Sequence, residues 1–305
     1  ARHQSITIRA ENWIAQAAER MAEAGLFFGH GTDNAADEAY WMVLHVLGLS
    51  VHACRLDEDT ELNDTQRVEL DALLHARIQS RRPLAYLLGE AWFAGLRFSL
   101  NHATLVPRSP IAELIVNGLK PWLDLNRPLR VLEVGTGSGC IALALAHYWP
   151  KLNIDAVDID RDALVMAAQN ADSLGLSDRV HWFESDLYGC IDQRYDLIIS
   201  NPPYVPLTSM DELPTEYHHE PRTALVAGDD GLELVRPLVL EAADHLRTDG
   251  WLLIEVGEAQ PQAEQWLAPV DPVWLEFEHG GDGVFLLSKL ASERLRTHPM
   301  ETQLA

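Results

Sequence analysis

Apolar residues recur at helical spacing through residues 10–82, in three separate sets. The sets are Trp13, Ile14, Ala17 and Met21; Ala39, Met42, Val43, Val46 and Leu47; and Val68, Leu70, Leu73, Leu74 and Ile78. Spacings of three and four residues place each set on one face of a helix. Asp64 precedes the third set at a position from which it would cap the helix, and Pro83 prevents the helix from continuing. The pattern predicts a small helical domain over residues 1–83.

Residues 84–105 follow a different pattern. Trp92-Phe93 and the segment 96–98 are short apolar stretches, and Gly89 and Gly95 separate them from their neighbours. Short apolar segments bounded by glycine are typical of a hairpin. We therefore expect residues 84–105 to form a hairpin linker.

From residue 106 onward, short apolar runs alternate with helical stretches. Strands are expected at 130–134, 154–159, 180–183, 197–200, 251–256, 273–277 and 284–287, and helices at 141–148, 163–174, 232–246 and 260–267. Alternation of this kind is typical of a mostly parallel sheet with helices on its faces. The last two strands would close the sheet with an antiparallel end. Residues 106–305 are thus predicted to form an α/β domain with a doubly wound sheet.

Length and charge add to this picture. A chain of 305 residues is long enough for two domains. The 46 acidic residues outnumber the 23 basic ones, which gives a formal net charge of −23. This charge repels phosphate backbones and attracts basic macromolecules, so direct DNA binding is not expected. The alternative is that the acidity serves only to keep the protein soluble.

The three cysteines indicate a reducing compartment. Cys54, Cys140 and Cys190 are far apart and form no Cys-x-x-Cys pair, so neither a disulfide framework nor a thiolate zinc site is indicated. No apolar run approaches the ~20 residues of a membrane span, and Ala1-Arg2-His3-Gln4 leads into a charged segment rather than a signal core. The expected location is cytoplasmic, with no membrane partner.

A glycine turn follows the first strand of the α/β domain. Gly135, Gly137 and Gly139 allow the backbone to pass close to a ligand, and Asp158 ends the next strand about 20 residues further on, where doubly wound folds place an acid against ribose hydroxyls. Cys140 stands where dinucleotide binders carry their third glycine, which disfavours nicotinamide. Glu133 and Asp158 suit the sulfonium cofactor S-adenosylmethionine, which has no phosphates. Taken alone, the glycines could also form a purely structural turn.

Two further segments follow strands. Asp186 could accept a hydrogen bond from an adenine amino group and Leu187 could pack on the ring, although an Asp after a strand is commonly only a cap or turn residue. Asn201-Pro202-Pro203-Tyr204 closes the run 195–200. The Asn201 side-chain oxygen and the Pro202 carbonyl could together accept both hydrogens of a planar amino group, with no strong general base required. The alternative is a rigid exit turn.

These motifs carry a resemblance. The segments 133–139, 157–160 and 201–204 resemble those of class I methyltransferases that modify planar amides or exocyclic amines. Glu220-Pro-Arg-Thr-Ala-Leu, Gly228-Asp-Asp-Gly and the helical N-terminal domain extend the likeness over nearly the whole chain to the protein-glutamine methyltransferases. The resemblance implies a Rossmann-like fold, S-adenosylmethionine as the cofactor, and transfer of a methyl group to a glutamine side chain.

Within that family, two segments distinguish the branches. Leu105-Val-Pro-Arg-Ser-Pro-Ile and Gly280-Gly-Asp-Gly-Val-Phe resemble the ribosomal-protein branch (PrmB) rather than the release-factor (HemK-like) branch. The implied substrate is a glutamine of large-subunit ribosomal protein three, a basic protein. The alternatives are methylation of release factors, methylation of DNA amino groups, and a ribosome-assembly factor that binds without turnover.

The resemblance also implies roles for individual residues. Tyr204 would supply an aromatic wall for the flat amide, and Arg108 would steady a substrate loop or merely pair with an acid. The expected cofactor-binding residues are Glu133, Gly135, Thr136, Gly137, Gly139, Asp158, Ile159, Asp186, Leu187 and Asn201. The expected catalytic and substrate-binding residues are Asn201, Pro202, Pro203, Tyr204 and Arg108.

Two other kinds of site are disfavoured. In His218-His219-Glu220, neighbouring residues rarely converge on one metal ion, and a solvated loop is the favoured interpretation. Ser138 lacks the Gly-x-Ser-x-Gly elbow of hydrolases. No metal site is expected.

Overall fold

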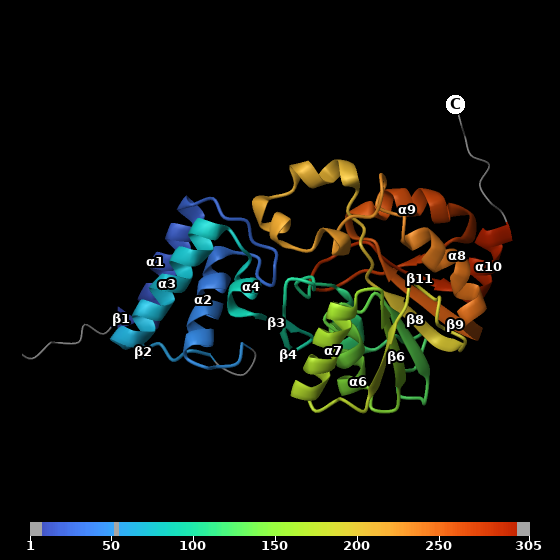
Figure 1. Cartoon of the computed structure of the whole chain (residues 1–305), viewed down its shortest axis with the longest axis horizontal. Helices are drawn as coiled ribbons and strands as arrows, with labels where there is room; N and C mark the ends of the chain where they lie inside the picture. Colours follow the sequence, from blue (N-terminus) through green and yellow to red (C-terminus); the bar gives the residue numbers. More distant parts are fainter. Residues whose placement is uncertain (1–7, 52–54, 298–305) are drawn as a thin grey trace, which may run out of the picture. The chain divides into compact units, whose positions relative to one another are not determined.

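The computed structural model describes residues 8–51 and 55–297, which form two compact units (Figure 1). The first unit comprises the described part of residues 1–100 together with Val106–Arg108 and Pro214–His219. The second comprises Asn101–Leu105, Ser109–Leu213 and the described residues from Glu220 onward. The two units therefore alternate along the chain. Cys54 and the segment Ala1 to Gln4 lie outside the described residues.

The first unit is mainly helical. Its helices are α1 (Ala10–Glu23), α2 (Ala35–Val46), α3 (Asp64–Ser80) and α4 (Leu84–Leu88), and its strands are β1 (Ile8–Arg9), β2 (Glu61–Leu62), β3 (Glu90–Phe93) and β4 (Leu96–Ser99). Strands β3 and β4 form the expected antiparallel hairpin. The apolar faces of α1, α2 and α3 meet in one core, in which Met21, Met42 and Leu70 are fully buried. The helical interpretation of residues 10–82 is confirmed.

The cap of α3 was wrongly assigned to Asp64. Asn63 caps this helix, because its side chain accepts a hydrogen bond from the Gln66 amide at 2.9 Å while Gln66 accepts one from the Asn63 amide at 3.0 Å. Asp64 is the first residue of the helix. Both neighbours are good capping residues, but only Asn63 has Gln66 three positions further on, which completes the reciprocal capping box.

The second unit alternates strands with helices, as expected. Its strands are β5 (Arg130–Val134), β6 (Asn153–Asp158), β7 (Val180–Glu184), β8 (Tyr195–Ser200), β9 (Leu246–Glu255), β10 (Val273–Trp274) and β11 (Val284–Ser288). Its α-helices are α5 (Ile111–Asn117), α6 (Cys140–Tyr148), α7 (Arg161–Ser173), α8 (Val235–His245), α9 (Gln260–Leu267) and α10 (Lys289–Thr297). Short 3₁₀ turns include η1 (Leu207–Glu212), η2 (Thr215–His219), which belongs to the first unit, and η3 (Arg222–Ala224).

The strands form one sheet in the order β10-β11-β9-β8-β5-β6-β7. Strands β9, β8, β5, β6 and β7 are parallel neighbours, whereas β11 pairs antiparallel with β9 and with β10. The predicted doubly wound sheet with an antiparallel end is thus confirmed. The chain leaves β5 toward β6 and β7 and then returns to β8 on the other side of β5. Open α/β sheets bind ligands at such a reversal, outside the carboxyl ends of the strands.

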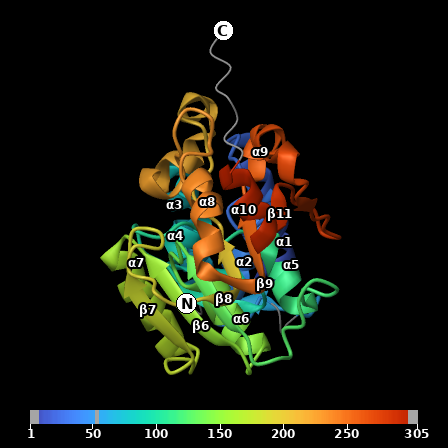
Figure 2. The same ribbon diagram turned by 90° about the vertical axis from the view of Figure 1, so that its right-hand side faces the viewer.

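Helices cover the sheet of the second unit. Helices α6 and α7 pack beside β6, and α8 and α10 beside β9 (Figure 1). Figure 2, turned by 90°, again shows α8 and α10 side by side. The central strands β5 and β8 are buried over most of their length, as expected where helices and neighbouring strands surround a sheet. Along residues 8–51 and 55–297, none of the helices is both long and apolar enough to cross a bilayer.

A buried cluster of charged side chains lies within the first unit. Glu216 of η2 is 0% exposed, and its Oε1 lies 3.0 Å from Arg81 Nη2 and 3.5 Å from Arg77 Nη1. The same oxygen accepts a hydrogen bond from the Phe27 amide at 3.0 Å. Arg77 is itself buried and donates to Glu38 at 2.6 Å. Ion pairs and hydrogen bonds thus join the segment Pro214–His219 to the helical unit.

Candidate active site

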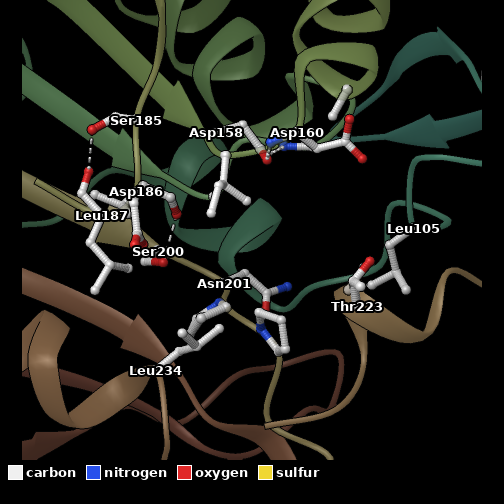
Figure 3. A pocket seen from close by; sticks show the side chains of 18 of the residues that line it. Leu105, Asp158, Asp160, Ser185, Asp186, Leu187, Ser200, Asn201, Thr223 and Leu234 are labelled. Carbon is white, nitrogen blue, oxygen red and sulfur yellow. Dashed lines mark hydrogen bonds between the residues drawn. The ribbon is translucent and has the colours of Figure 1, made fainter. Parts of the chain in front are cut away.

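A cavity of about 310 Å³ lies at the carboxyl ends of the central strands of the second unit (Figure 3). The turn after β5, the end of β6, the segment after β7 and the turn after β8 all contribute to its wall. The predicted site residues that line it are Gly135, Gly137, Asp158, Ile159, Asp186, Leu187, Asn201, Pro202 and Pro203. Segments far apart in the sequence therefore converge on one site, at the reversal of strand order.

The three glycines of the turn after β5 have two different roles. Gly135 and Gly137 line the cavity with φ values of +73° and +55°, and a methyl group added at either would meet no atom within 4 Å. A ligand can therefore approach this backbone closely. Gly139 has φ +81° and faces the interior, where an added Cβ would lie 3.0 Å from Ala167 and Trp182. Gly139 supports the turn without lining the cavity.

Asp158 connects the end of β6 to the glycine turn. One carboxylate oxygen accepts a hydrogen bond from the Gly137 amide at 2.8 Å, and the other accepts one from the Asp160 amide at 2.9 Å. Burial raises the pKa of Asp158 above its usual value, and these two amide bonds oppose that rise. Each carboxylate oxygen has a second lone pair, so Asp158 can still accept bonds from the hydroxyls of a ligand.

Glu133 lies behind the turn rather than in the cavity wall. Its side chain is 1% exposed, and Oε2 accepts hydrogen bonds from the Thr136 hydroxyl at 2.6 Å and the Ala142 amide at 2.9 Å. Burial raises the pKa of Glu133 to about 8 despite these bonds, and the nearby Asp158 adds to the rise. Glu133 and Thr136 therefore brace the turn and the first residues of α6 from inside.

Asp186 and Leu187 line the cavity in the segment after β7. Leu187 has φ +46°, a left-handed conformation that costs free energy for a residue with a side chain. The Ser185 hydroxyl donates to the Leu187 carbonyl at 3.1 Å, and the Gly189 amide donates to the Asp186 carbonyl at 2.9 Å. A strained backbone held by local bonds is common at ligand sites. Asp186 is a turn residue that also faces the cavity.

Asn201 begins the turn after β8. Just before it, the Ser200 hydroxyl donates to the Val134 carbonyl at 2.7 Å and so joins the end of β8 to the end of β5. In Figure 3 the Asn201 side chain lies between two groups of labelled residues, with Asp186 and Leu187 on one side and Leu105 and Thr223 on the other. Residues from both sides therefore line the same cavity as Asn201.

Tyr204 and Arg108 lie outside the cavity wall. The Tyr204 hydroxyl lies 3.3 Å from Glu255 Oε1, and its ring packs so closely on Gly257 that an added Cβ there would lie 2.5 Å from it. Arg108 belongs to the first compact unit, where its guanidinium lies over the ring of Tyr217 at 5.2 Å from the centroid. Neither side chain is among those that line the cavity, and the aromatic wall expected from Tyr204 and the substrate contact expected from Arg108 stay predictions.

Several cavity residues were not predicted. They are Ala103, Leu105, Asp160, Ala163, Ser185, Ser200, Thr223, Ala224, Leu234 and Leu238. Leu105 and Thr223 belong to segments that carried the family resemblance, which was the available signal for a role at the site. Leu234 and Leu238 read as ordinary core residues of a helix, and their place in the wall follows from the packing of α8 alone.

The disfavoured sites can be located as well. Ser138 is buried in the glycine turn, where its carbonyl accepts a hydrogen bond from Asn170 at 2.9 Å. His218 and His219 end η2 in the first unit. Among the residues that the structure describes, no group of three or more His, Cys, Asp or Glu side chains could hold a metal ion.

Comparison with known proteins identifies the family. Residues 113–215 match the methyltransferase small domain, and residues 12–89 match the PrmC N-terminal domain. A ribosomal protein uL3 glutamine methyltransferase of Xanthomonas campestris is 46% identical over 273 residues, which cover 89% of this chain and 88% of the relative. The chain belongs to this family of glutamine methyltransferases. A relative of the same name in Neisseria gonorrhoeae is 42% identical over 275 residues, 90% of this chain and 92% of its own.

A solved structure agrees on the fold. The catalytic domain of hMettl16, solved in complex with an RNA hairpin, superposes with a TM-score of 0.50 at 17% identity and covers 77% of this chain and 87% of its own. At this identity the likeness concerns only the arrangement of the chain. The class I methyltransferase fold and the family assignment expected from the sequence are both confirmed.

Proposed function

We propose that this protein transfers a methyl group from S-adenosylmethionine to the side-chain amide nitrogen of a glutamine in ribosomal protein uL3. The observation that carries the proposal is the position of Asn201. It lies at the reversal of strand order and lines the cavity, with Asp186 and Leu187 on one side of it and Leu105 and Thr223 on the other in Figure 3. Relatives that match nearly the whole chain bear the name of this activity.

The acidic side chains in the cavity wall suit S-adenosylmethionine as the ligand. The described residues that line the cavity include the three carboxylates of Asp158, Asp160 and Asp186 but no lysine or arginine. Such a wall suits a cationic ligand without phosphates, because nothing in it neutralises a phosphate and a carboxylate favours a nearby positive charge. The open approach at Gly135 and Gly137 and the free lone pairs of Asp158 suit the methionine and ribose portions.

Asn201 and Pro202 would then hold the acceptor. The bound cofactor supplies an electrophilic methyl group on a positively charged sulfur. A glutamine amide nitrogen is a weak nucleophile because its lone pair is delocalised into the carbonyl group. The Asn201 side-chain oxygen and the Pro202 carbonyl would accept hydrogen bonds from its two N–H groups. These bonds would hold the nitrogen about 3 to 3.5 Å from the methyl carbon and stabilise the positive charge that develops on it. The nitrogen would form the new bond to carbon as the bond between sulfur and the methyl group breaks, so that S-adenosylhomocysteine leaves and the nitrogen releases one proton to water.

The charge of the chain supports a basic protein substrate. A net charge of −23 speeds the encounter with a cationic partner and opposes the approach of nucleic acid. We propose that the reaction takes place in the cytoplasm, without direct DNA contact. The encounter rate with uL3 should fall as salt is raised, because added ions screen the attraction.

The proposal is tested by offering labelled S-adenosylmethionine together with uL3, peptide release factors and DNA, each in a separate reaction. We expect label on uL3 alone, and peptide mapping should place one methyl group on a glutamine side chain. Label confined to a release factor would move the substrate to the sister branch of the family. Label on DNA would contradict a protein substrate.

Glu133 predicts a pH dependence of cofactor binding. Its folded pKa of about 8 lies above the ordinary value, so the unliganded protein keeps this group protonated near neutrality and loses stability as pH rises from about 4.5 through about 8. The negative charge of ionised Glu133 should strengthen the binding of a ligand that carries the positive sulfonium. The affinity for S-adenosylmethionine relative to S-adenosylhomocysteine, which lacks that charge, should therefore rise between pH 7 and pH 9, as measured by calorimetry.

The Glu133→Gln variant is the control for this effect. Glutamine keeps the shape of the side chain and one oxygen that can accept the bonds from Thr136 and Ala142. The sulfonium charge lowers the pKa of the amino group in S-adenosylmethionine only, but this property of the ligand contributes equally in both proteins. The rise of the ratio with pH should therefore be smaller in this variant than in the wild type. A ratio that rises equally in both proteins would rule out Glu133 as the source.

A further inference from the structure

The buried side chain of Glu255 lies beside the turn Asn201-Pro202-Pro203-Tyr204 and has no part in the methyl transfer as proposed above. Glu255 ends β9, the neighbour of β8 in the sheet, and is 3% exposed. One carboxylate oxygen lies 3.3 Å from the Tyr204 hydroxyl, and the other accepts a short hydrogen bond from the Ser109 hydroxyl. A single buried side chain thus connects two segments that are far apart in the sequence.

Both segments lead directly to the cavity. Tyr204 is the last residue of the turn that contains Asn201 and Pro202. Ser109 follows the stretch that contains the cavity residue Leu105, and its hydroxyl also accepts a hydrogen bond from the Ile111 amide at 3.1 Å at the start of α5. Glu255 therefore links two segments of the chain. One is the turn that would hold the amide, and the other is the stretch that leads from Leu105 to Ser109.

The surroundings leave Tyr204 little freedom. An added Cβ at Gly257 would overlap its ring, and one at Gly231 would clash with its carbonyl oxygen. The next residue is fixed as well, because the Val205 amide donates to the Leu225 carbonyl at 2.8 Å and the Val205 carbonyl accepts from the Ala227 amide at 3.0 Å. The Tyr204 hydroxyl is the outer end of this rigid arrangement, and Glu255 fixes it.

A carboxyl group is an energetically unfavourable choice for a position as buried as that of Glu255. A buried polar group costs free energy unless hydrogen bonds compensate, whereas an apolar side chain would pack there at no such cost. What a carboxylate offers is two acceptor oxygens in a fixed plane, which can accept from two hydroxyl groups at once. The arrangement at Glu255 uses both oxygens in this way.

We propose that Glu255 is a positioning residue for the methyl transfer. By holding Tyr204 and Ser109, it fixes the position of the Asn201 and Pro202 oxygens that would bind the amide. The inference depends on the proposed function, because the turn must be placed for an acceptor amide. Catalysis by positioning is sensitive to geometry, and an error of about 1 Å in the placement of a reacting group costs about 100-fold in rate. Glu255 itself is not among the residues that line the cavity.

The test compares Glu255→Gln and Tyr204→Phe with the wild-type protein. Glutamine keeps the shape of the side chain but replaces one acceptor oxygen by an amide group that only donates, so only one of the two hydroxyl groups can still donate to it. We expect kcat to fall about 10- to 100-fold in Glu255→Gln while the Kd for S-adenosylhomocysteine changes less than about twofold. Because Tyr204→Phe removes a hydroxyl that Glu255 holds, the combined loss in kcat should be smaller than the sum of the two separate losses in ΔΔG‡. Glu264→Gln, an exposed glutamate of α9, is the matched control with unchanged kcat.

Hydrogen exchange provides a readout that needs no methyl acceptor. The Val205 amide should exchange faster in both variants than in the wild type, because the turn before it is released. This measurement decides the inference even if uL3 receives no methyl group, in which case the proposed function fails separately. Unchanged kcat and unchanged exchange would overturn the inference. Parallel loss of kcat and of cofactor affinity would also overturn it, because that result indicates a general structural role.

Discussion

Replacing Asn201 by alanine is expected to lower kcat for methyl transfer by about 10²- to 10³-fold, with S-adenosylmethionine still bound. The substitution removes one of the two oxygen acceptors that would hold the amide nitrogen and stabilise its developing charge. It leaves intact the cofactor side of the cavity, where Asp158 is fixed by the Gly137 and Asp160 amides. The loss should appear in kcat rather than in the Kd for the cofactor.

Single-turnover rates with uL3 and calorimetric titration with S-adenosylmethionine measure the two quantities. Asn153→Ala is a matched control, because this asparagine is exposed at the opposite end of the sheet, where β6 begins, and should leave both values unchanged. Undiminished transfer by Asn201→Ala would reject the role of the asparagine oxygen. An equal loss of cofactor affinity would show that Asn201 acts on the cofactor instead.

Replacing Glu216 by alanine is expected to destabilise the helical unit by about 3 to 5 kcal/mol, the usual cost of removing one partner from a buried ion pair. Arg77 would keep its buried charge, and the Phe27 amide would lose its acceptor. Burial acts to raise the pKa of Glu216, but the Phe27 amide and the two arginines outweigh it, so the pKa lies below its ordinary value. This stabilisation is present above the ordinary carboxyl pKa and is lost as pH falls through the folded pKa.

Native-state hydrogen exchange of the full chain measures this effect, with the Phe27 amide and the α3 amides as reporters. Protection should drop in Glu216→Ala at pH 7, and the difference from the wild type should shrink under acidic conditions. Glu212→Gln, an exposed neighbour in η1, should leave protection unchanged. A change smaller than about 0.5 kcal/mol, the usual range for surface substitutions, would show that the cluster does not stabilise the unit.

The sheet and its ligand edge could be predicted because they depend on local signals. Short runs rich in apolar residues, such as 130–134 and 195–200, predict buried parallel strands, and the polar or glycine residues at their ends mark the carboxyl edge. Asn201, Asp158 and Asp186 each follow a run of this kind. Topology alone then brings them together, so neither tertiary packing nor side-chain contact had to be known in advance.

The remaining features depend on contacts between distant residues. Glu255 ends its strand like any polar residue, and its partners Ser109 and Tyr204 are 146 and 51 positions away. Helix α10 was missed because it is strongly polar, and its buried residues are Ser292 and Leu295. The orientation of Tyr204 toward β9 follows from the absence of a side chain at Gly257. No spacing rule encodes any of these contacts.

The passage of Pro214–His219 into the helical unit has a consequence for evolution. The polypeptide leaves the methyltransferase unit after Leu213 and returns to it at Glu220. A gene fragment that encoded only residues from 109 onward would therefore carry Glu216 without Arg77 and Arg81, the cations that balance it. Recombination that separated the two units would leave Glu216 without its partners and so destabilise the product. We therefore expect the two units to be inherited together.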